Sequence, residues 1–316
     1  STTSATTGNN TITLVSLSDG TYSNCTIIVT DSAGNVSNTL SITSFTVDTT
    51  APTVAQVTTV TTPTNDTTPN YTFSSSEAGT ITYGGSCSSS TTSAIAGTIT
   101  VTLNALSEGT YADCVFSVTD SAGNVSASFT MQPFIIDTTA PTISSIYPTD
   151  NQIGVSVSGN ISVTFSEEME TTYVTTNTSD TYCAGTLRVS SNNFSTCVKM
   201  SSSPNSSNSD KTFTVDPSDN LSYSTTYKIR VTTGVKDSAG NTLSSQYETS
   251  NGFTTSGLFV TWGNSGTILT SSDGTTWYNR TSGTSNHLYG ITYGKSTFVG
   301  VGASGTILTS SDGTTW

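Results

Sequence analysis

The sequence has little charge, and very little of that charge is positive. Charged side chains make up 9% of the 316 residues, with 8 Lys and Arg against 21 Asp and Glu, so the formal net charge is −13. Proteins that bind nucleic acid or anionic membranes use clustered basic side chains to neutralise phosphate. Because the sequence has no basic cluster, its composition argues against both kinds of partner.

Long apolar runs and helical patterns are also missing. No run approaches the roughly 18 consecutive apolar residues that indicate a membrane-spanning helix, and no amphipathic stretch with a helical period exceeds a turn or two. Instead Thr, Val, Ile, Tyr and Phe alternate with polar residues, which is the pattern of β-strands. The sequence therefore predicts an all-β chain.

An internal repeat organises the first half of the sequence. Residues 1–53 recur without a gap as residues 90–142, at an offset of 89. A period near 90 residues is typical of a β-sandwich module and too long for one solenoid coil. We predict an incomplete module over 1–51 and a complete one over 52–140. The linker Asp-Thr-Thr-Ala-Pro-Thr ends each copy, and its proline should make it short and semi-rigid.

The five cysteines fit this organisation. In the second module Cys87 precedes Cys114 by 27 residues. Cys25 is the equivalent of Cys114 in the first module, so the equivalent of Cys87 would lie just before residue 1, in a larger protein. Cys114 shares a core-facing strand side with Phe116 and Val118, where it could bridge two sheets or remain a free buried thiol. Paired cysteines in small modules without a C-x-x-C motif indicate a secreted protein. The expected disulfides are Cys87–Cys114 and Cys183–Cys197.

Three strings in residues 1–140 carry a family resemblance. These are G-T-Y-x-x-C, D-S-A-G-N and V-D-T-T-A-P-T, of which D-S-A-G-N reads as a tight turn. The region resembles the tandem bacterial Ig-like repeats of large surface adhesins. Tyr lies three residues before Cys in place of the two found in antibody domains, so the antibody disulfide topology is not carried over.

Residues 142–255 show a different ordered set of motifs. Tyr147-Pro148-Thr149-Asp150 is followed by Gly154-Val155, by Phe165-Ser166-Glu167-Glu168-Met169 and by Asp237-Ser238-Ala239-Gly240-Asn241. This order resembles the Ig-like module of S-layer proteins, which implies a third sandwich over 141–256. Residues 176–211 depart from the family pattern. We predict a decorated hairpin there, closed by a Cys183–Cys197 disulfide worth about 3 kcal/mol in the chain-entropy account.

The last region has a shorter repeat. Residues 263–277 recur as 302–316 at an offset of 39, close to the blade length of a β-propeller. Ser272-Asp273-Gly274-x-Thr276-Trp277 resembles a shortened Asp-box hairpin, in which Asp273 and Asp312 would stabilise a turn. The resemblance covers residues 258–316 and implies a region of partial β-propeller-like blade repeats over 257–316.

The sequence offers little for catalysis. His287 is the only histidine and lies in a Gly/Ser/Asn-rich stretch, and neither a nucleophile elbow nor a His-Glu-x-x-His motif is present. Glu167, Glu168 and Glu170 could suggest a glycosidase carboxylate pair. They fall in the string that the S-layer-type module uses as a strand exit, so a solvated turn is expected. We therefore expect that the chain is not an enzyme.

Calcium is the one cofactor that the sequence suggests. Six aspartates lie in the predicted turns, in the linkers or at the start of a module, and the resembling adhesin repeats hold calcium at such junctions. Ca²⁺ takes six to eight oxygen ligands, whereas the alternative is that these residues only cap turns. The candidate ligands are Asp31, Asp48, Asp66, Asp120, Asp137 and Asp150.

The sequence as a whole predicts a structural protein. We expect a stalk or fibre-forming segment of a large bacterial extracellular or cell-surface protein, adhesin-like, with a surface glycan or protein as a partner. The alternative is the spacer region of a secreted carbohydrate-active or glycan-binding propeller protein. The first module should expose sheet edges and a core face. If residue 1 were a mature terminus, a strand from another subunit would complete that module and build a fibre.

Overall fold

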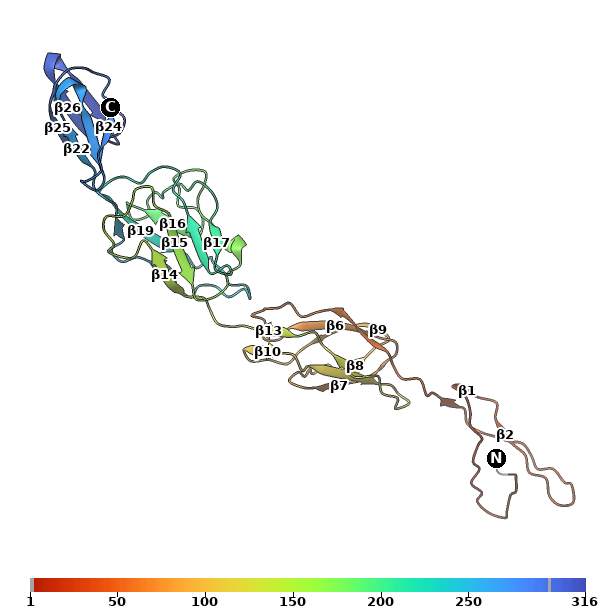
Figure 1. Ribbon diagram of the computed structural model, residues 1–316. Helices are drawn as coiled ribbons and strands as arrows, with labels where there is room; N and C mark the ends of the chain where they lie inside the picture. Colours follow the sequence, from red (N-terminus) through yellow and green to blue (C-terminus); the bar gives the residue numbers. More distant parts are fainter. Residues whose placement is uncertain (1–2, 295–296) are drawn as a thin grey trace. The chain divides into compact units, whose positions relative to one another are not determined.

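Strands make up almost all the regular structure of the chain. The computed structural model describes residues 3–294 and 297–316. The chain consists of two compact units, residues 1–138 and 139–316 (Figure 1). No helix in the described ranges is long and apolar enough to cross a membrane. The all-β prediction is confirmed. Beside the strands, the described part of the chain has three single 3-10 turns, η1 (Thr171–Tyr173), η2 (Asn264–Gly266) and η3 (Ala303–Gly305).

The first unit contains one complete set of antiparallel sheets. A three-stranded sheet has the order β5-β6-β9, a four-stranded sheet has the order β12-β11-β7-β8, and β10 pairs with β13. The strands are β5 (Val54–Thr58), β6 (Asn70–Ser75), β7 (Gly79–Gly84), β8 (Ser93–Ala94), β9 (Gly97–Thr102), β10 (Gly109–Tyr111), β11 (Val115–Thr119), β12 (Phe129–Thr130) and β13 (Phe134–Ile136).

The core of this unit follows the alternation of the strands. Phe73 of β6 and Val118 of β11 are fully buried, and Phe116 is 2% exposed. The rings of Phe73 and Phe116 lie 4.4 Å apart between their centroids, so side chains of the two larger sheets meet. Burial of each large apolar side chain contributes roughly 1.5–3 kcal/mol. The core therefore depends on both sheets being present.

The Cys87–Cys114 disulfide is present, as predicted. The bonded alternative for Cys114 is thus the one found, and its partner lies just after the end of β7. β7 and β11 are neighbours in one sheet, with Gly84 opposite Val115. Cys114 directly precedes β11, and Cys87 lies three residues beyond the end of β7, after the turn at Gly85 and Ser86, so the turn brings Cys87 back to Cys114. The crosslink ties adjacent strands of the same sheet.

Residues 20–47 form a second, smaller set of strands in the same unit. β1 (Gly20–Tyr22) pairs with β4 (Phe45–Val47), and β2 (Thr26–Ile27) pairs with β3 (Leu40–Ser41). Among the described residues before position 51, no further strand covers these pairs. The predicted last strand of each module, at 45–47 and at 134–136, is confirmed.

The linker between these two parts is hydrogen-bonded on both sides. Asp19 accepts hydrogen bonds from the Thr49 N–H at 3.0 Å and from the Thr50 hydroxyl at 2.8 Å. At the other end Thr53 exchanges bonds with Ser76, from the Thr53 N–H to Oγ at 2.9 Å and from the Ser76 N–H to the Thr53 carbonyl at 3.0 Å. These bonds restrict the six residues from 48 to 53.

The second unit begins with a two-sheet sandwich over one core. One sheet has the order β14-β15-β18-β17, and the other has β16-β19-β20 with β21 also paired to β19. Phe165 and Phe213 pack edge to face in the core, 5.9 Å apart. The strands are β14 (Ile143–Tyr147), β15 (Ile161–Phe165), β16 (Leu187–Ser190), β17 (Asn205–Ser207), β18 (Thr212–Val215), β19 (Thr226–Val231), β20 (Tyr247–Glu248) and β21 (Phe253–Thr254).

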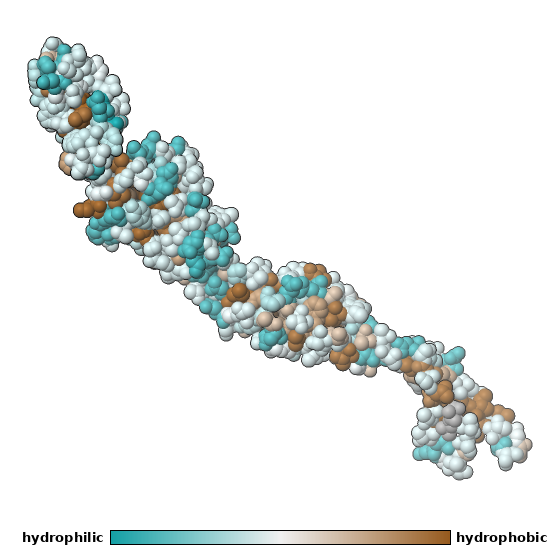
Figure 2. All heavy atoms as spheres, viewed as in Figure 1, coloured by the Kyte–Doolittle hydropathy of each residue, from teal (hydrophilic) through white to brown (hydrophobic). Residues whose placement is uncertain are grey.

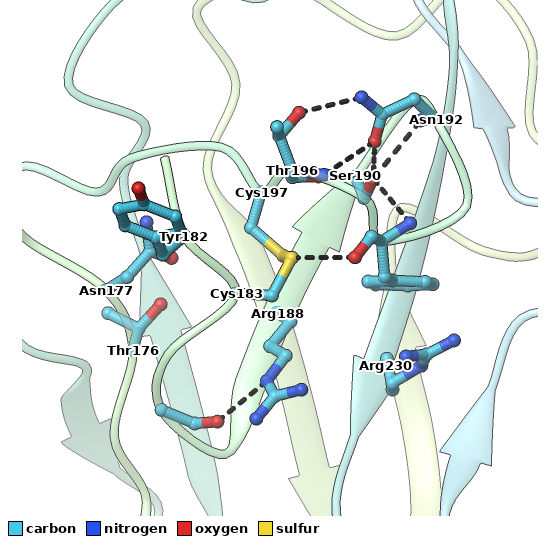
Figure 3. The surroundings of a disulfide bond; sticks show 12 residues. Thr176, Asn177, Tyr182, Cys183, Arg188, Ser190, Asn192, Thr196, Cys197 and Arg230 are labelled. Atoms are coloured by element: carbon cyan, nitrogen blue, oxygen red, sulfur yellow. Dashed lines mark hydrogen bonds between the residues drawn. A yellow bond between two sulfur atoms is a disulfide. The ribbon is translucent and has the colours of Figure 1, made fainter. Parts of the chain in front are cut away.

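The segment 176–211 is not the single decorated hairpin that the sequence predicted. It carries β16, which pairs with β19, and β17, which pairs with β18, so its two strands belong to different sheets. The buried pair Leu187 and Val189 explains this, because their apolar face is part of the core. The predicted Cys183–Cys197 disulfide is confirmed and closes the loop around β16 (Figure 3).

The remaining residues form two antiparallel meanders. Each consists of three strands, in the orders β22-β23-β24 and β25-β26-β27. Their strands are β22 (Phe259–Trp262), β23 (Ile268–Ser271), β24 (Tyr278–Arg280), β25 (Leu288–Gly294), β26 (Thr297–Gly302) and β27 (Ile307–Ser310).

Loss of the first disulfide should destabilise the first unit alone. Cys87→Ser/Cys114→Ser is expected to lower its unfolding free energy by about 2–4 kcal/mol, because the unfolded chain regains freedom. Amide exchange in urea, read by mass spectrometry over residues 52–138, measures the change after peptide mapping without reduction. Cys183→Ser/Cys197→Ser is the matched control and should leave exchange over those residues unchanged. Equal protection in the first variant and the unmodified chain would contradict the prediction.

Candidate functional site

The D-S-A-G-N turns have the same geometry in all three copies. In each, one carboxylate oxygen of the first Asp accepts backbone N–H groups two and four residues later, at 2.8–2.9 Å. The other oxygen accepts a hydrogen bond from the Asn side-chain amide, and Gly holds a positive φ, for example +96° at Gly123. The predicted tight turn is confirmed at Asp31, Asp120 and Asp237.

These hydrogen bonds act on the ionisation of the carboxylates. The side-chain amide of Asn35, followed by its backbone N–H, lowers the pKa of Asp31. Burial raises the pKa of Asp120, but the hydrogen bonds from Asn124 and Ala122 outweigh it, so the pKa lies below its ordinary value. A carboxylate that accepts several N–H groups is stabilised in its charged form. Both aspartates are therefore anionic at neutral pH.

Three carboxylates of the first unit converge at the end of the linker. Asp48 follows β4, Glu77 lies between β6 and β7, and Asp120 follows β11; each offers an oxygen within 4.8 Å of the others. The Asn124 amide also donates to the backbone carbonyl of Asp48, at 3.1 Å. We call Asp48, Glu77 and Asp120 the linker carboxylates. They bring together oxygen atoms of the kind that Ca²⁺ prefers.

The charge around the linker carboxylates is one-sided. The first 187 residues contain no Lys, Arg or His, and Arg188 is the first basic side chain of the sequence. The first unit therefore has no basic side chain to balance three carboxylates that lie close together. Like charges at this spacing repel one another. A cation from solution would relieve that repulsion.

The other four candidate ligands lie outside the linker carboxylates. Asp31 is held in its own turn, and Asp66 is exposed and accepts bonds from Thr68. Asp150 accepts backbone N–H groups at 3.0 and 2.6 Å, from residues 251 and 252. Asp137 directly follows β13, and its N–H donates to a carbonyl of the same unit. The Asp66 carboxylate thus caps a local turn, whereas the Asp150 carboxylate binds the backbone of a loop distant in the sequence.

Glu77 is the ligand candidate that the sequence analysis missed. It lies 29 positions from Asp48 and follows a strand exit, where no acidic neighbour draws attention to it. A signal was available, because Ser76-Glu77 follows β6 as Ser166-Glu167 follows β15. In the second unit, Glu167 and Asp237 have oxygens within 4.8 Å of each other. The Ser-Glu pair after this strand thus recurs beside a D-S-A-G-N turn.

Basic side chains appear around the second disulfide, where they are part of the structure. Arg188 and Arg230 lie near this disulfide (Figure 3). The Arg230 guanidinium is 3.7 Å from the ring centre of Phe194 and pairs with Glu248 at 2.7 Å. Arg188 donates from Nε to the Gly185 carbonyl, and burial, then the charge of Arg230, lowers its pKa. These contacts hold the loop from Cys183 to Cys197 against β16 and β19.

The tail residues also have structural roles. Asp273 accepts the backbone N–H groups of Thr276 and Thr275 at 2.8 and 2.7 Å, which lower its pKa, and Asp312 makes the equivalent turn. His287 accepts the Ser265 N–H at its Nδ1, at 3.1 Å. The histidine thus binds the backbone of η2, which contains Ser265.

Comparisons with known proteins identify Ig-like domains in both units. Residues 57–138 and residues 137–255 match two different family models, each described as a bacterial Ig-like domain. No curated protein matches the sequence. The chain thus contains two bacterial Ig-like domains, as the motifs predicted for these regions.

Solved structures of a bacterial surface protein match part of the chain. A crystal structure of the N-terminal part of the bacterial S-layer protein SbsC is 16% identical, with a TM-score of 0.28, and the match covers 54% of this chain and 44% of that chain. A structure of surface layer protein SbsC, domains 1–6, is also 16% identical, with a TM-score of 0.27, and 25% of it is covered. The chain thus spans less than half of each.

Acid should weaken the Asp120 turn. Because the folded-state pKa of Asp120 is lowered, its contribution is complete above the unfolded value of about 3.9 and is lost as the pH falls through the folded-state pKa. In Asp120→Asn two amides face each other at Asn124. We expect Tm to fall by a few degrees at pH 7 and to depend less on acid below pH 4. Calorimetry with a chelator present measures this, and Asp66→Asn is the control. An unchanged acid dependence in Asp120→Asn would contradict the assignment.

Proposed function

We propose that this chain is a stalk segment of a large bacterial extracellular or cell-surface protein, adhesin-like in character. The observation that carries the proposal is the hydrogen bonding of the linkers. Residues 48–53 are bound by Asp19 on one side and by Ser76 on the other. A linker held in this way transmits force between modules and keeps them apart, whereas a free Gly/Ser linker would behave as a flexible coil.

The second linker repeats this arrangement at each of its ends. Within the first unit the Thr138 hydroxyl donates to Glu108 at 3.2 Å. Within the second unit the Thr142 N–H donates to the Ser166 hydroxyl at 3.0 Å. Glu108 and Ser166 correspond to Asp19 and Ser76 at the first linker. The same linker chemistry therefore recurs, as a stalk of similar modules requires.

The covalent chemistry supports a location outside the cell. Two disulfides stabilise small β-sandwich domains, and disulfides persist in oxidising compartments. The surface is rich in Ser and Thr and poor in Lys, so its strand edges have few charges that block pairing. This supports lateral association of stalks into a fibre as part of the proposal, with a surface glycan or protein as the partner.

Calcium is the cofactor that we propose for the linker. The linker carboxylates lie where the linker meets the complete module, beside the hydrogen bond from the Asn124 amide to the Asp48 carbonyl. A Ca²⁺ ion there would neutralise three carboxylates and would join residues from both sides of the linker. Its role would be to stiffen the stalk, with no part in catalysis, since the proposal includes no enzyme activity.

A second function is supported by the tail. The repeat at an offset of 39 places equivalent turns at Asp273 and Asp312, each with the carboxylate bound by two backbone N–H groups. Such hairpins support the alternative of a propeller-type head that binds or processes glycans, with the Ig-like domains as spacers. Retention of the chain on immobilised surface glycans would favour this alternative over a purely mechanical role.

The stalk proposal predicts how the linker responds to mutation. Small-angle X-ray scattering of the chain should show an extended particle. Asp19→Ala/Asn124→Ala, which removes linker hydrogen bonds, should reduce the mean radius of gyration and broaden the distance distribution. Asp66→Ala is the control, because the Asp66 carboxylate accepts hydrogen bonds from nearby Thr68 and makes no bond to residues 48–53. A compact, folded-back particle for the unmodified chain would overturn the stalk.

The calcium proposal predicts a change in stoichiometry. Titration calorimetry should find Ca²⁺ bound to the chain, and Glu77→Gln should remove one ion per chain, because a neutral amide replaces one of three anionic ligands. Glu168→Gln is the control, since Glu168 is exposed and outside the linker carboxylates. The same number of bound ions in Glu77→Gln and in the unmodified chain would exclude the linker carboxylates as the site.

A further inference from the structure

The basic side chains of the sequence are concentrated in one domain. Six of the eight Lys and Arg residues lie between positions 188 and 236. Three of them project outward from one sheet and form what we call the arginine face: Arg188 of β16, and Lys228 and Arg230 of β19. Their neighbours along the strands, Val189 and Ile229, are fully buried in the core on the other side of the sheet. The outer surface of this sheet is therefore cationic in a chain with a net charge of −13.

Two of the three cations lie opposite each other. Arg188 pairs in register with Arg230, and Cβ atoms at such positions lie about 4.5–5.5 Å apart, where like charges destabilise a sheet. Burial, then the charge of Arg230, lowers the pKa of Arg188. Glu248 pairs with Arg230 at 2.7 Å and with Lys228 at 3.3 Å. No carboxylate within the described ranges pairs with Arg188, so the three cations face a single acidic side chain.

Both guanidinium groups are held in place and keep N–H groups free. Arg188 donates from Nε to the Gly185 carbonyl at 2.8 Å. Arg230 donates from Nε and from one Nη to the same oxygen of Glu248, at 3.0 and 2.7 Å. A guanidinium has five N–H donors in a fixed plane, and no other acceptor among the described residues binds these two arginines. The remaining donors form a preorganised fork for a carboxylate.

The loop between the two cysteines of the second disulfide forms the rim of the arginine face (Figure 3). The Ser190 hydroxyl accepts the Phe194 N–H at 2.9 Å, and the Phe194 ring centre lies 3.7 Å from the Arg230 guanidinium. These contacts and the disulfide fix the loop. On either side of Phe194, the exposed side chains of Asn193 and Ser195 bind no other described residue. The rim thus offers a free amide and a free hydroxyl group beside the cations.

We propose that the arginine face binds an acidic glycan through a carboxylate group of its sugar rings. The carboxylate lies between Arg188 and Arg230 and accepts their free N–H groups, while ring hydroxyl groups bond to Asn193 and Ser195. Hydrogen bonds between charged groups are about twice as strong as neutral ones. This names a class for the glycan partner of the proposed function, and it rests on that function for a location outside the cell.

A glycan fits this surface better than an acidic protein does. Stable protein interfaces have a core of aromatic and other apolar side chains. Within β16, β19, β20 and the loop 183–197, all of them described, no large apolar side chain is exposed. Patches of strongly hydrophilic residues lie on the surface of this domain (teal in Figure 2). A sugar acid presents a carboxylate and several hydroxyl groups, which match the charged, amide and hydroxyl groups of the face.

The charge of the rest of the chain restricts where such a ligand binds. Residues 1–187 contain many acidic side chains and no basic one. An acidic glycan is repelled there and attracted to the domain that carries the arginine face. Because the attraction is electrostatic and the face is open to solvent, binding should weaken as the salt concentration rises.

Titration calorimetry with an oligomer of galacturonic acid tests the proposal on the full chain, with both disulfides intact. A chelator is present, so that calcium does not bridge the glycan to the linker carboxylates. The oligomer should bind at low salt, whereas its methyl ester, which has the same rings without free carboxylates, should not. Equal binding of the oligomer and its ester, or no binding of either, would overturn the proposal.

Variants of matched charge locate the site. Arg188→Gln should weaken binding at least about tenfold, because hydrogen bonds to a charged group are lost. Arg188→Lys should also weaken it, since Lys keeps the charge without the planar fork. Lys199→Gln is the control, because it removes one charge from an exposed residue outside the arginine face and should keep the affinity. Equal losses in Arg188→Gln and Lys199→Gln would contradict the site.

Two further comparisons complete the test. A poly-glutamate peptide of matched charge should bind more weakly than the oligomer, and equal or tighter binding would assign the face to an acidic protein and overturn the glycan. Thermal denaturation checks that each variant is folded, and Arg188→Lys carries the comparison if Arg188→Gln is not. The scattering experiment on the linkers is independent of both. An extended particle that does not bind removes the glycan and leaves the stalk, and a compact particle that binds does the reverse.

Discussion

An amphipathic strand in this chain is stable as part of a core only when a second sheet covers its apolar face. The two copies of the repeat show this constraint directly. With β6 and β7 in place, Leu103 and Val118 are buried and β9 is a strand, whereas the equivalent Leu14 and Val29 are exposed and residues 8–13 form no strand. Because charged residues are scarce, the chain gains little from ion pairs, and burial between sheets has to supply most of its stability.

Local turns are independent of that constraint. The D-S-A-G-N turn has the same hydrogen bonds at Asp31, in the partial module, as at Asp120 and Asp237 in complete ones. Side-chain to backbone bonds within five residues need no distant partner. The turns therefore keep the hairpins in register before any sheet covers them, which is why the partial module keeps the strand pairing of the complete one.

The linkers combine both kinds of interaction. Asp19 and Ser76 lie in the modules on either side of residues 48–53, so the linker bonds form only when both flanking parts have folded. The same folding brings Asp48, Glu77 and Asp120 together in a region without basic side chains. The hydrogen bonds of the linker and the proposed calcium site thus lie at the same junction between two modules.

The sequence by itself determined the features that depend on neighbours along the chain or on exact repetition. Strand alternation predicted the all-β class, the two cysteines 27 residues apart within one module predicted Cys87–Cys114, and the Asp-Gly-Asn pattern predicted the turns. About a third of the candidate calcium ligands, Asp48 and Asp120, were found to lie together in the structure.

Only the tertiary structure decided features that depend on which strands become neighbours. β7 lies beside β11, and the disulfide joins the ends of these two strands. Leu187 and Val189 are buried in the core, so β16 pairs with β19 and residues 176–211 are not a separate hairpin. Glu77 joins Asp48 and Asp120 for the same reason. Burial of apolar side chains over the whole domain selects which distant strands pair, and a local sequence pattern does not specify that choice.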